Sequence, residues 1–253
     1  MSVAQQTIRR YRNPPVVEAL CELFFEGSEW DDTVVGRFYD RVKEKFPKRR
    51  KVELQEAQFT FSDKGHTTAG IQSLPPQMQF LSEEGNSLLQ LRRDLLVVNQ
   101  LRPYPHFAVW EPNIYWALKM YWEMTKPKGI RRIGLRYINR IVIPEAPVRM
   151  EDYFNIYPQL PKQMGDIHGS FMIRVELPCA QKGHAVVVTF ASAPPDQPGQ
   201  IAHLLDLYGI FNASMPLNEH EVQTEIRTAH ANLNTAFEGS ITQRLRTIFD
   251  PIS

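Results

Sequence analysis

Three arginines recur at every fourth position of one segment, and their guanidinium groups suit chemistry with anions. They are Arg132, Arg136 and Arg140, in RRIGLRYINRIVI at 131–143. We interpret this segment as a β-strand, and strand residues two apart share a face. All three guanidinium groups are therefore expected on one side. A planar guanidinium matches the geometry of a carboxylate or a phosphate, so this side is a candidate anion site.

The opposite side of the same strand is expected to face the core. Its side chains are mainly apolar: Ile133, Leu135, Tyr137, Asn139, Ile141 and Ile143. The segment therefore predicts a strand with one core face and one cationic face.

Glutamates repeat with the same spacing near the start of the chain. Glu18, Glu22 and Glu26 lie in VVEALCELFFEG, which we interpret as a strand, although a helix also fits. Four strand residues span about 13 Å, so the two charged rows would match if the strands were antiparallel neighbours. We expect Glu22 to pair with Arg136 and the outer residues to pair crosswise. Each such pair would contribute roughly 0.2–1 kcal/mol.

The functional alternative is that these charges line a cleft for an anionic ligand. Arg174 and Glu176 alternate onto one face of FMIRVEL and could join that surface. In an enzyme acting on a phosphate-bearing substrate, the arginines would hold the anion. Glu18, Glu22 or Glu26 would then hold a divalent metal or serve as a base. Both interpretations remain open from the sequence.

The composition narrows the class of protein. The chain has 253 residues, 43% of them hydrophobic, and a formal net charge of +1, so a nucleic-acid partner is not expected. Cys21 and Cys179 cannot build a disulfide framework, which fits a reducing compartment. The polar start and the lack of a run of about 18 apolar residues predict neither a secretory signal nor a membrane span. We expect a cytoplasmic protein.

The order of elements appears twice along the chain. A strand at 17–26 and a helix after Asp31 or Asp32 precede strand candidates at 57–62, 67–72 and 77–82. Residues 87–101 form one bent strand or a hairpin, and a tryptophan-rich helix follows at 111–125. The strand at 131–143 then begins a second series. This predicts an α+β fold, mainly antiparallel sheet, with two similar β-α-β-β-β-α halves at 1–128 and 129–253, packed as one unit. Internal duplication and coincidence both explain the repetition.

The last helix is the best candidate for self-association. It is predicted from about Leu217 to Phe249, about 45 Å long, with Asn218 and Glu221 as a capping box and Gly239 as a break. Its small and apolar residues form a narrow stripe: Val222, Ile226, Ala229, Leu233, Ala236 and Ser240. The stripe predicts either a homo-oligomer seam or packing on the chain's own sheet.

The sequence contains no recognisable catalytic motif, that is, no set of catalytic residue types in a known order and spacing. No glycine-rich loop precedes a lysine and a serine or threonine in P-loop order, and no GxSxG elbow occurs. Asp166 and His168, in GDIHG, form only a weak metal pair. We expect no cofactor and no metal site.

Two segments together carry a resemblance to a known family. YRNPPVVEALCELFF and RIGLRYINRI resemble a sporadically distributed prokaryotic family of roughly this length whose function is uncharacterised. The resemblance implies a prokaryotic source and neighbouring mobile or defence genes, and it supplies no catalytic residues. The expected function is a non-enzymatic binding or regulatory module that self-associates and recognises a protein partner or an anionic small molecule. The alternative is the phosphate-directed enzyme described above.

Overall fold

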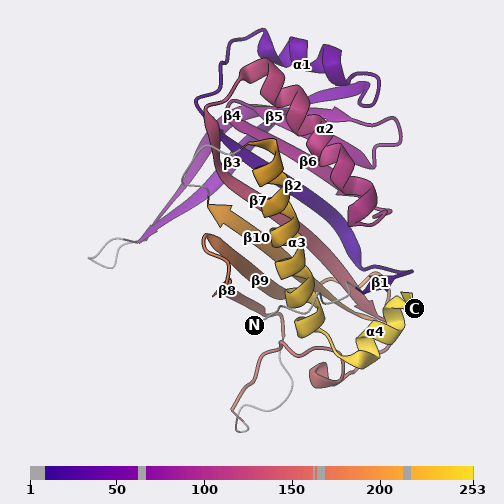
Figure 1. The fold of residues 1–253 in the computed structure, drawn as a ribbon. Coiled ribbons are helices and arrows are strands. Elements are labelled where there is room, and N and C mark those ends of the chain that lie inside the picture. The colour runs from indigo at the N-terminus through magenta and orange to yellow at the C-terminus, as the bar shows by residue number, and fades with distance from the viewer. Residues whose placement is uncertain (1–8, 62–66, 162, 164–168, 213–217, 253) are drawn as a thin grey trace.

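A nine-stranded antiparallel sheet forms the centre of the molecule (Figure 1), with the strand order β3-β4-β5-β6-β2-β7-β10-β9-β8. The computed structural model describes residues 9–61, 67–161, 163, 169–212 and 218–252, with only the backbone described at 54–61 and 67–76. Asp166 and His168 lie outside the described residues. The strands are β2 (Val16–Glu26), β3 (Lys48–Phe61), β4 (Thr67–Leu81), β5 (Ser87–Arg92), β6 (Leu95–Leu101), β7 (Gly129–Ile143), β8 (Met172–Pro178), β9 (His184–Ala193) and β10 (Ile201–Asn212).

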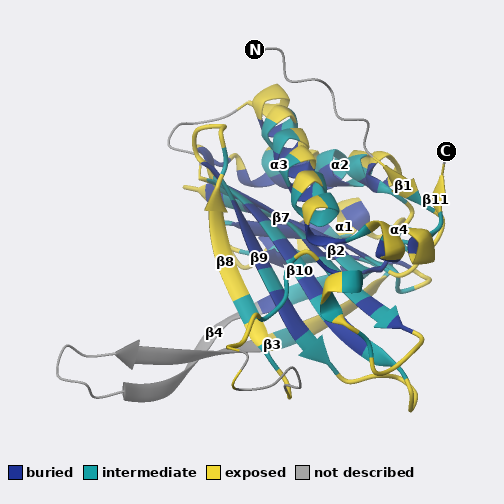
Figure 2. Cartoon of the chain, turned by 90° about the horizontal axis from the view of Figure 1, so that it is seen from below, coloured by how far each residue is buried: buried dark blue, intermediate teal, exposed yellow. Residues whose placement is uncertain are grey.

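The helices cover one face of this sheet. They are α1 (Val34–Val42), α2 (Phe107–Thr125), α3 (Glu219–Ser240) and α4 (Gln243–Phe249), with a 3₁₀ turn η1 (Met150–Asp152). Helices α2 and α3 lie across the sheet, and α1 packs on α2 (Figure 1). Among the described residues no helix covers the other face (Figure 2). None of the described helices is both long and apolar enough to cross a bilayer.

The period-two pattern of the central strands determines which side chains enter the core. Ala19, Cys21 and Leu23 of β2 are fully buried beneath the helices. The β7 residues that share this face are buried as well, including Tyr137 and Asn139. The core face predicted for residues 131–143 is therefore confirmed. The arginines of β7 lie on the side without helices.

The two halves of the chain meet at the centre of the sheet. Strands β2 and β7 are antiparallel neighbours, and the last strand of each half, β6 or β10, flanks its first strand. The predicted α+β class is confirmed. The halves differ in detail because residues 87–101 form the β5–β6 hairpin, turning at Arg93 and Asp94, so the first half has a fourth strand after its helix. Internal duplication remains a prediction.

The last predicted helix is two helices. Ile241 is buried and extended between α3 and α4, so the chain turns after Ser240 and not at Gly239. The predicted capping box at Asn218 and Glu221 is confirmed, with backbone-to-side-chain distances of 3.0 and 2.9 Å. Most of the apolar stripe is buried, and α3 contacts β10, β7 and β9. The stripe therefore packs on the chain's own sheet.

A second, two-stranded sheet joins the two ends of the described chain. Strand β1 (Arg10–Tyr11) pairs with β11 (Pro251–Ile252), antiparallel. Arg12 N–H donates to the carbonyl of Asp250 at 2.9 Å, and Asn13 N–H donates to that of Phe249 at 3.0 Å. These bonds hold the residues that precede β2 beside α3 and α4.

Candidate functional site

The arginines of β7 lie beside the glutamates of β2, but in a different register from the predicted one. Arg136 faces Leu20, and Glu22 faces Gly134. The predicted Glu22–Arg136 ion pair is therefore wrong. Arg136 instead binds Asp206 of β10 through two hydrogen bonds of 2.8 and 2.5 Å. In this register the arginines of β7 and the glutamates of β2 do not lie opposite one another. Asp206 of β10 supplies the carboxylate that Arg136 binds.

The outer crosswise pairs are also wrong. Arg140 binds Asp196 at 2.8 and 2.9 Å and the carbonyl of Pro194 at 2.7 Å. Glu18 accepts a hydrogen bond from the Asn99 amide at 2.6 Å. Glu26, at the end of β2, faces Gly129. Two of the three arginines are thus occupied by carboxylates from the chain itself.

Arg132 and Glu22 are joined through a third side chain. The Tyr208 hydroxyl accepts from Arg132 at 2.6 Å and donates to Glu22 at 2.6 Å. It crosses β7 above Gly134, where an added Cβ would lie 2.6 Å from that hydroxyl. Burial, followed by the charge of Glu22, raises the pKa of Tyr208. Arg174 lies on β8, separated from β7 by β10 and β9, so it does not join this group.

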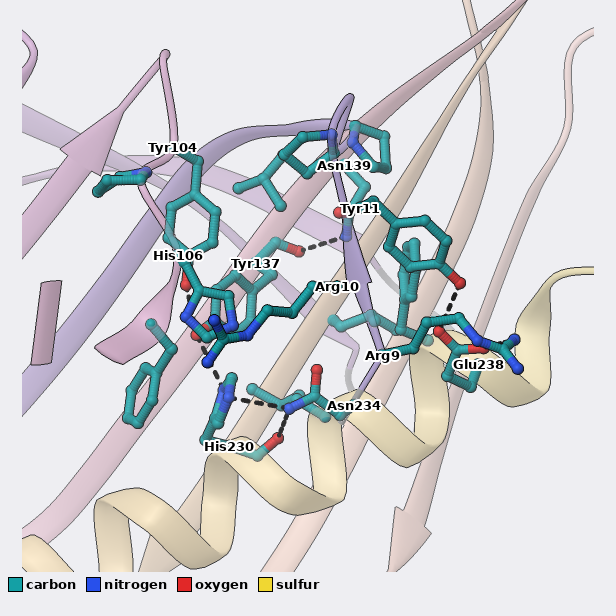
Figure 3. A pocket seen from close by; sticks show the side chains of 18 of the residues that line it. Arg9, Arg10, Tyr11, Tyr104, His106, Tyr137, Asn139, His230, Asn234 and Glu238 are labelled. Atoms are coloured by element: carbon teal, nitrogen blue, oxygen red, sulfur yellow. Dashed lines mark hydrogen bonds and ion pairs between the residues drawn. The ribbon is translucent and has the colours of Figure 1, made fainter. Parts of the chain in front are cut away.

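A pocket of about 410 Å³ opens on the helix-covered face (Figure 3). Its walls come from residues 9–16, the loop before α2, strand β7 and the second half of α3. This volume lies within the range of small-molecule sites. None of its residues was among those singled out for chemistry from the sequence.

Three arginines line this pocket, Arg9, Arg10 and Arg12, and they differ in their partners. Figure 3 shows the Arg10 side chain directed toward His106 and His230. The neighbouring Arg9 and Arg12 bind Glu238 and Asp250 at 3.3 and 2.9 Å. Arg10 has no ion-pair or hydrogen-bond partner among the described residues. A guanidinium group without a counter-ion at the mouth of a pocket is suited to an incoming anion.

His106 presents a second hydrogen-bond donor. It is the N-cap of α2, and its Nδ1 accepts from Ala108 N–H at 3.2 Å, so the neutral ring carries its proton on Nε2. Its backbone has a φ of 95°, a region that costs energy for any residue except glycine. Burial, followed by the charge of Arg10, lowers the pKa of His106. The positive end of the α2 dipole lies at the same place.

Tyr137 presents a third donor through a chain of side chains. The Asn234 amide donates to His230 Nε2 at 3.0 Å, which places the His230 proton on Nδ1. His230 Nδ1 then donates to the Tyr137 hydroxyl at 3.0 Å, and Tyr104 also donates to it, at 3.2 Å. With both acceptor positions used, the hydroxyl proton of Tyr137 is left to donate into the pocket.

The rest of the lining supplies acceptors and apolar walls. The side-chain oxygens of Asn139 and Asn234 accept no hydrogen bond from the described residues, since the hydrogen bonds of both side chains involve their nitrogens. Apolar surface lies between these groups, from Phe107, Leu207 and Leu233. The pocket thus combines donors, the guanidinium of Arg10, two amide oxygens and apolar walls, while the other charged groups of its lining, Arg9, Arg12 and Glu238, are engaged in ion pairs. It fits an organic anion that also carries a hydroxyl or amino group.

The two segments on which the family resemblance rests meet at this pocket. Pro14, Pro15 and Val16 line it from one segment, and Tyr137 and Asn139 line it from the other. Val16 faces Asn139 in the β2–β7 ladder. The signal in the sequence that could have indicated this pocket is a pair of polar side chains, Tyr137 and Asn139, in a row of apolar residues. That pattern indicates polar groups beneath the helices but does not indicate their partners.

The described residues contain no cluster of histidine, cysteine, aspartate or glutamate suited to a metal ion. The chain matches no protein-family model and no curated protein sequence. The candidate site therefore rests on its geometry.

Proposed function

We propose that this protein is a binding or regulatory protein whose pocket takes a small organic anion. The ligand class is a carboxylate or phosphate ester that carries a hydroxyl or amino group. Arg10 carries this proposal because it reaches the pocket without a partner among the described residues. His106 and Tyr137 would add hydrogen bonds to the same anionic group, and Asn139 and Asn234 would accept from the polar end.

The alternative function, an enzyme acting on a phosphate-bearing substrate through the arginines of β7, has less support. Arg136 and Arg140 are already bound to Asp206 and Asp196. An anion would have to displace these carboxylates before it could bind. A cytoplasmic location, a protein partner and a link to mobile or defence genes are further proposals that rest on composition and on the family resemblance.

Arg10→Gln tests the proposed site. Purified protein would be heated with inorganic phosphate, O-phosphoserine or 3-hydroxybutyrate at constant ionic strength, and the melting temperature would be recorded. We expect O-phosphoserine or 3-hydroxybutyrate to raise the melting temperature of the wild type. Because the loss of a charge-assisted contact costs about 1.5–3 kcal/mol, Arg10→Gln should weaken the affinity about tenfold or more.

Arg93→Gln is the matched control, since Arg93 is an exposed arginine in the β5–β6 turn, outside the pocket. It should respond to the same compounds as the wild type does. Equal stabilisation of Arg10→Gln and the wild type would place the anion elsewhere and refute the proposal. Native mass spectrometry of the untreated protein gives a second measurement. The proposal would be supported if the wild type carried the additional mass of a small organic acid and Arg10→Gln did not.

A further inference from the structure

Strand β8 is an exposed edge of the nine-stranded sheet. In the part of the chain that the structure describes it pairs with β9 alone, and every residue from Met172 to Pro178 except Ile173 is exposed. Figure 2 shows the strand as an exposed strip along the side of the sheet. Three of its apolar side chains are among the most exposed of the described chain: Met172 at 71%, Val175 at 38% and Leu177 at 49%. An edge with these properties is a template for a further strand.

The outward hydrogen-bonding groups of β8 can be assigned from its neighbours. Ser192 N–H donates to Phe171 O at 3.1 Å, and Cys179 N–H donates to His184 O at 3.0 Å. The β8–β9 register has no bulge between these bonds, and the direction of the backbone groups alternates along a strand. The odd-numbered residues therefore bond to β9. The backbone N–H and C=O groups of Arg174 and Glu176 therefore point away from β9, in the plane of the sheet and towards its open edge.

The side chains of β8 divide into an apolar face and a face that carries Arg174 and Glu176 between Met172 and Pro178. Ile173, Val175 and Leu177 face Phe190, Val188 and Val186 of β9, whose side chains belong to the core. The apolar row of the core thus continues to the edge of the sheet and ends there exposed. Arg174 and Glu176 lie on the other face, and neither has an ion-pair partner among the described residues.

We propose that β8 pairs with β8 of a second copy of this chain. The two strands would be antiparallel, with a twofold axis at Val175, and the two sheets would form one continuous sheet. In this register Arg174 of each copy faces Glu176 of the other. Both residues direct their backbone groups outward, so each such pair exchanges two backbone hydrogen bonds. On the other face Ile173 packs against Leu177, and Val175 packs against its own counterpart.

The charges select this register and this partner. Moving the second strand by two residues places Arg174 against Arg174 or Glu176 against Glu176, which is unfavourable. Parallel pairing in register places like charges together as well. The edge is thus complementary to itself in one antiparallel arrangement, as a twofold interface requires. This favours a second copy over an unrelated extended peptide. The interface is independent of the pocket, so either proposal stands without the other.

The test is a charge exchange between two variants, followed by mass measurement in solution. The wild type should have twice the chain mass of 29.3 kDa. Arg174→Glu and Glu176→Arg, each alone, place like charges in both pairs and should raise the dissociation constant about tenfold or more. Mixing these two variants restores opposite charges in both pairs. The mixture should form a heterodimer at a concentration at which neither variant alone forms a homodimer.

The double variant R174E/E176R should also dimerise, because its charges are exchanged within one chain. Glu44→Arg makes the same charge change at an exposed residue of the loop after α1 and should leave the dimer intact. A wild type of 29.3 kDa would overturn the proposal. A dimer that survives both single changes, or a mixture that forms no heterodimer, would overturn it as well. Circular dichroism would establish that each variant is folded.

Discussion

His230 shows how the surroundings of one side chain determine its chemistry. Its ring stacks on Phe107, with 3.8 Å between the ring centroids. Burial, with a smaller effect of the nearby His106, lowers its pKa to about 3. A neutral ring can accept from Asn234 and donate to Tyr137 at the same time, which a protonated ring cannot do. The bond from the Asn234 amide to Nε2, which places the single ring proton on Nδ1, therefore depends on neutral His230.

The stability of the protein should depend on pH through His230. Because its folded pKa is below its unfolded value of about 6.5, the unfolded chain binds a proton first as the pH falls. His230 should therefore lower the free energy of unfolding as the pH falls from about 6.5 towards 3, by up to about 1.4 kcal/mol per pH unit. Urea unfolding between neutral pH and about pH 5 measures this slope.

His230→Phe should be less stable at neutral pH, because it leaves the partners of His230 without a hydrogen bond, but its stability should fall less steeply as the pH is lowered. His220→Phe changes an exposed histidine in the first turn of α3 and should keep the wild-type slope. An unchanged slope in His230→Phe would assign the pH dependence to other groups.

At the scale of elements, the charged row of β7 connects the central strands through side-chain hydrogen bonds. Arg136 and Asp206 join β7 to β10, and the Arg132–Tyr208–Glu22 chain joins β10 to β2 across Gly134. These contacts lie on the face that none of the described helices covers, and they connect three strands there. They favour a structural role for the row.

A double-mutant cycle tests this explanation. Arg136→Met should destabilise the protein, and Asp206→Leu in the same chain should restore part of the loss, because neither charge is then left without its partner. The side chain of Arg136 is 40% exposed, so solvent screens the pair, and we expect a coupling energy of about 1 kcal/mol. The cycle of Arg136→Met with Glu22→Leu is the control and should give a smaller coupling. A larger coupling with Glu22 would restore the pairing predicted from the sequence.

Sequence patterns predicted which face of a strand is buried better than they predicted which side chains contact each other. The alternation in residues 131–143 identified the buried side of β7, because burial of apolar residues follows the strand period. It did not identify Asp206 as the partner of Arg136, because the register between strands is set by the packing of the whole sheet. The pocket was missed for a similar reason. Two of its polar residues, Arg10 and His106, lie far apart in sequence, and only the folded chain brings them together.

At the scale of the whole molecule, the two ends of the described chain meet beside the pocket. Tyr11 donates to Glu238 of α3 at 2.7 Å and packs edge-on against Phe237 and Phe249, at 6.2 and 5.7 Å between ring centroids. Burial, followed by the hydrogen bond to Glu238, raises the pKa of Tyr11 to about 12. Tyr11 thus holds β1 on α3 and α4, and Arg10 takes its position from the same strand.

Tyr11→Ala should release β1 and β11 together. The change removes the two ring contacts and the hydrogen bond through which Tyr11 holds β1, and among the described residues this strand pairs with the two residues of β11 alone. Amide hydrogen exchange should become faster at residues 9–13 and at Asp250 and Ile252, and it should stay unchanged in the β5–β6 hairpin, whose strands lie in the central sheet. Anion-dependent stabilisation should fall as in Arg10→Gln, although Arg10 itself is present. Faster exchange at residues 9–13 alone would mean that β11 is held without β1, and that the two ends do not act as one unit.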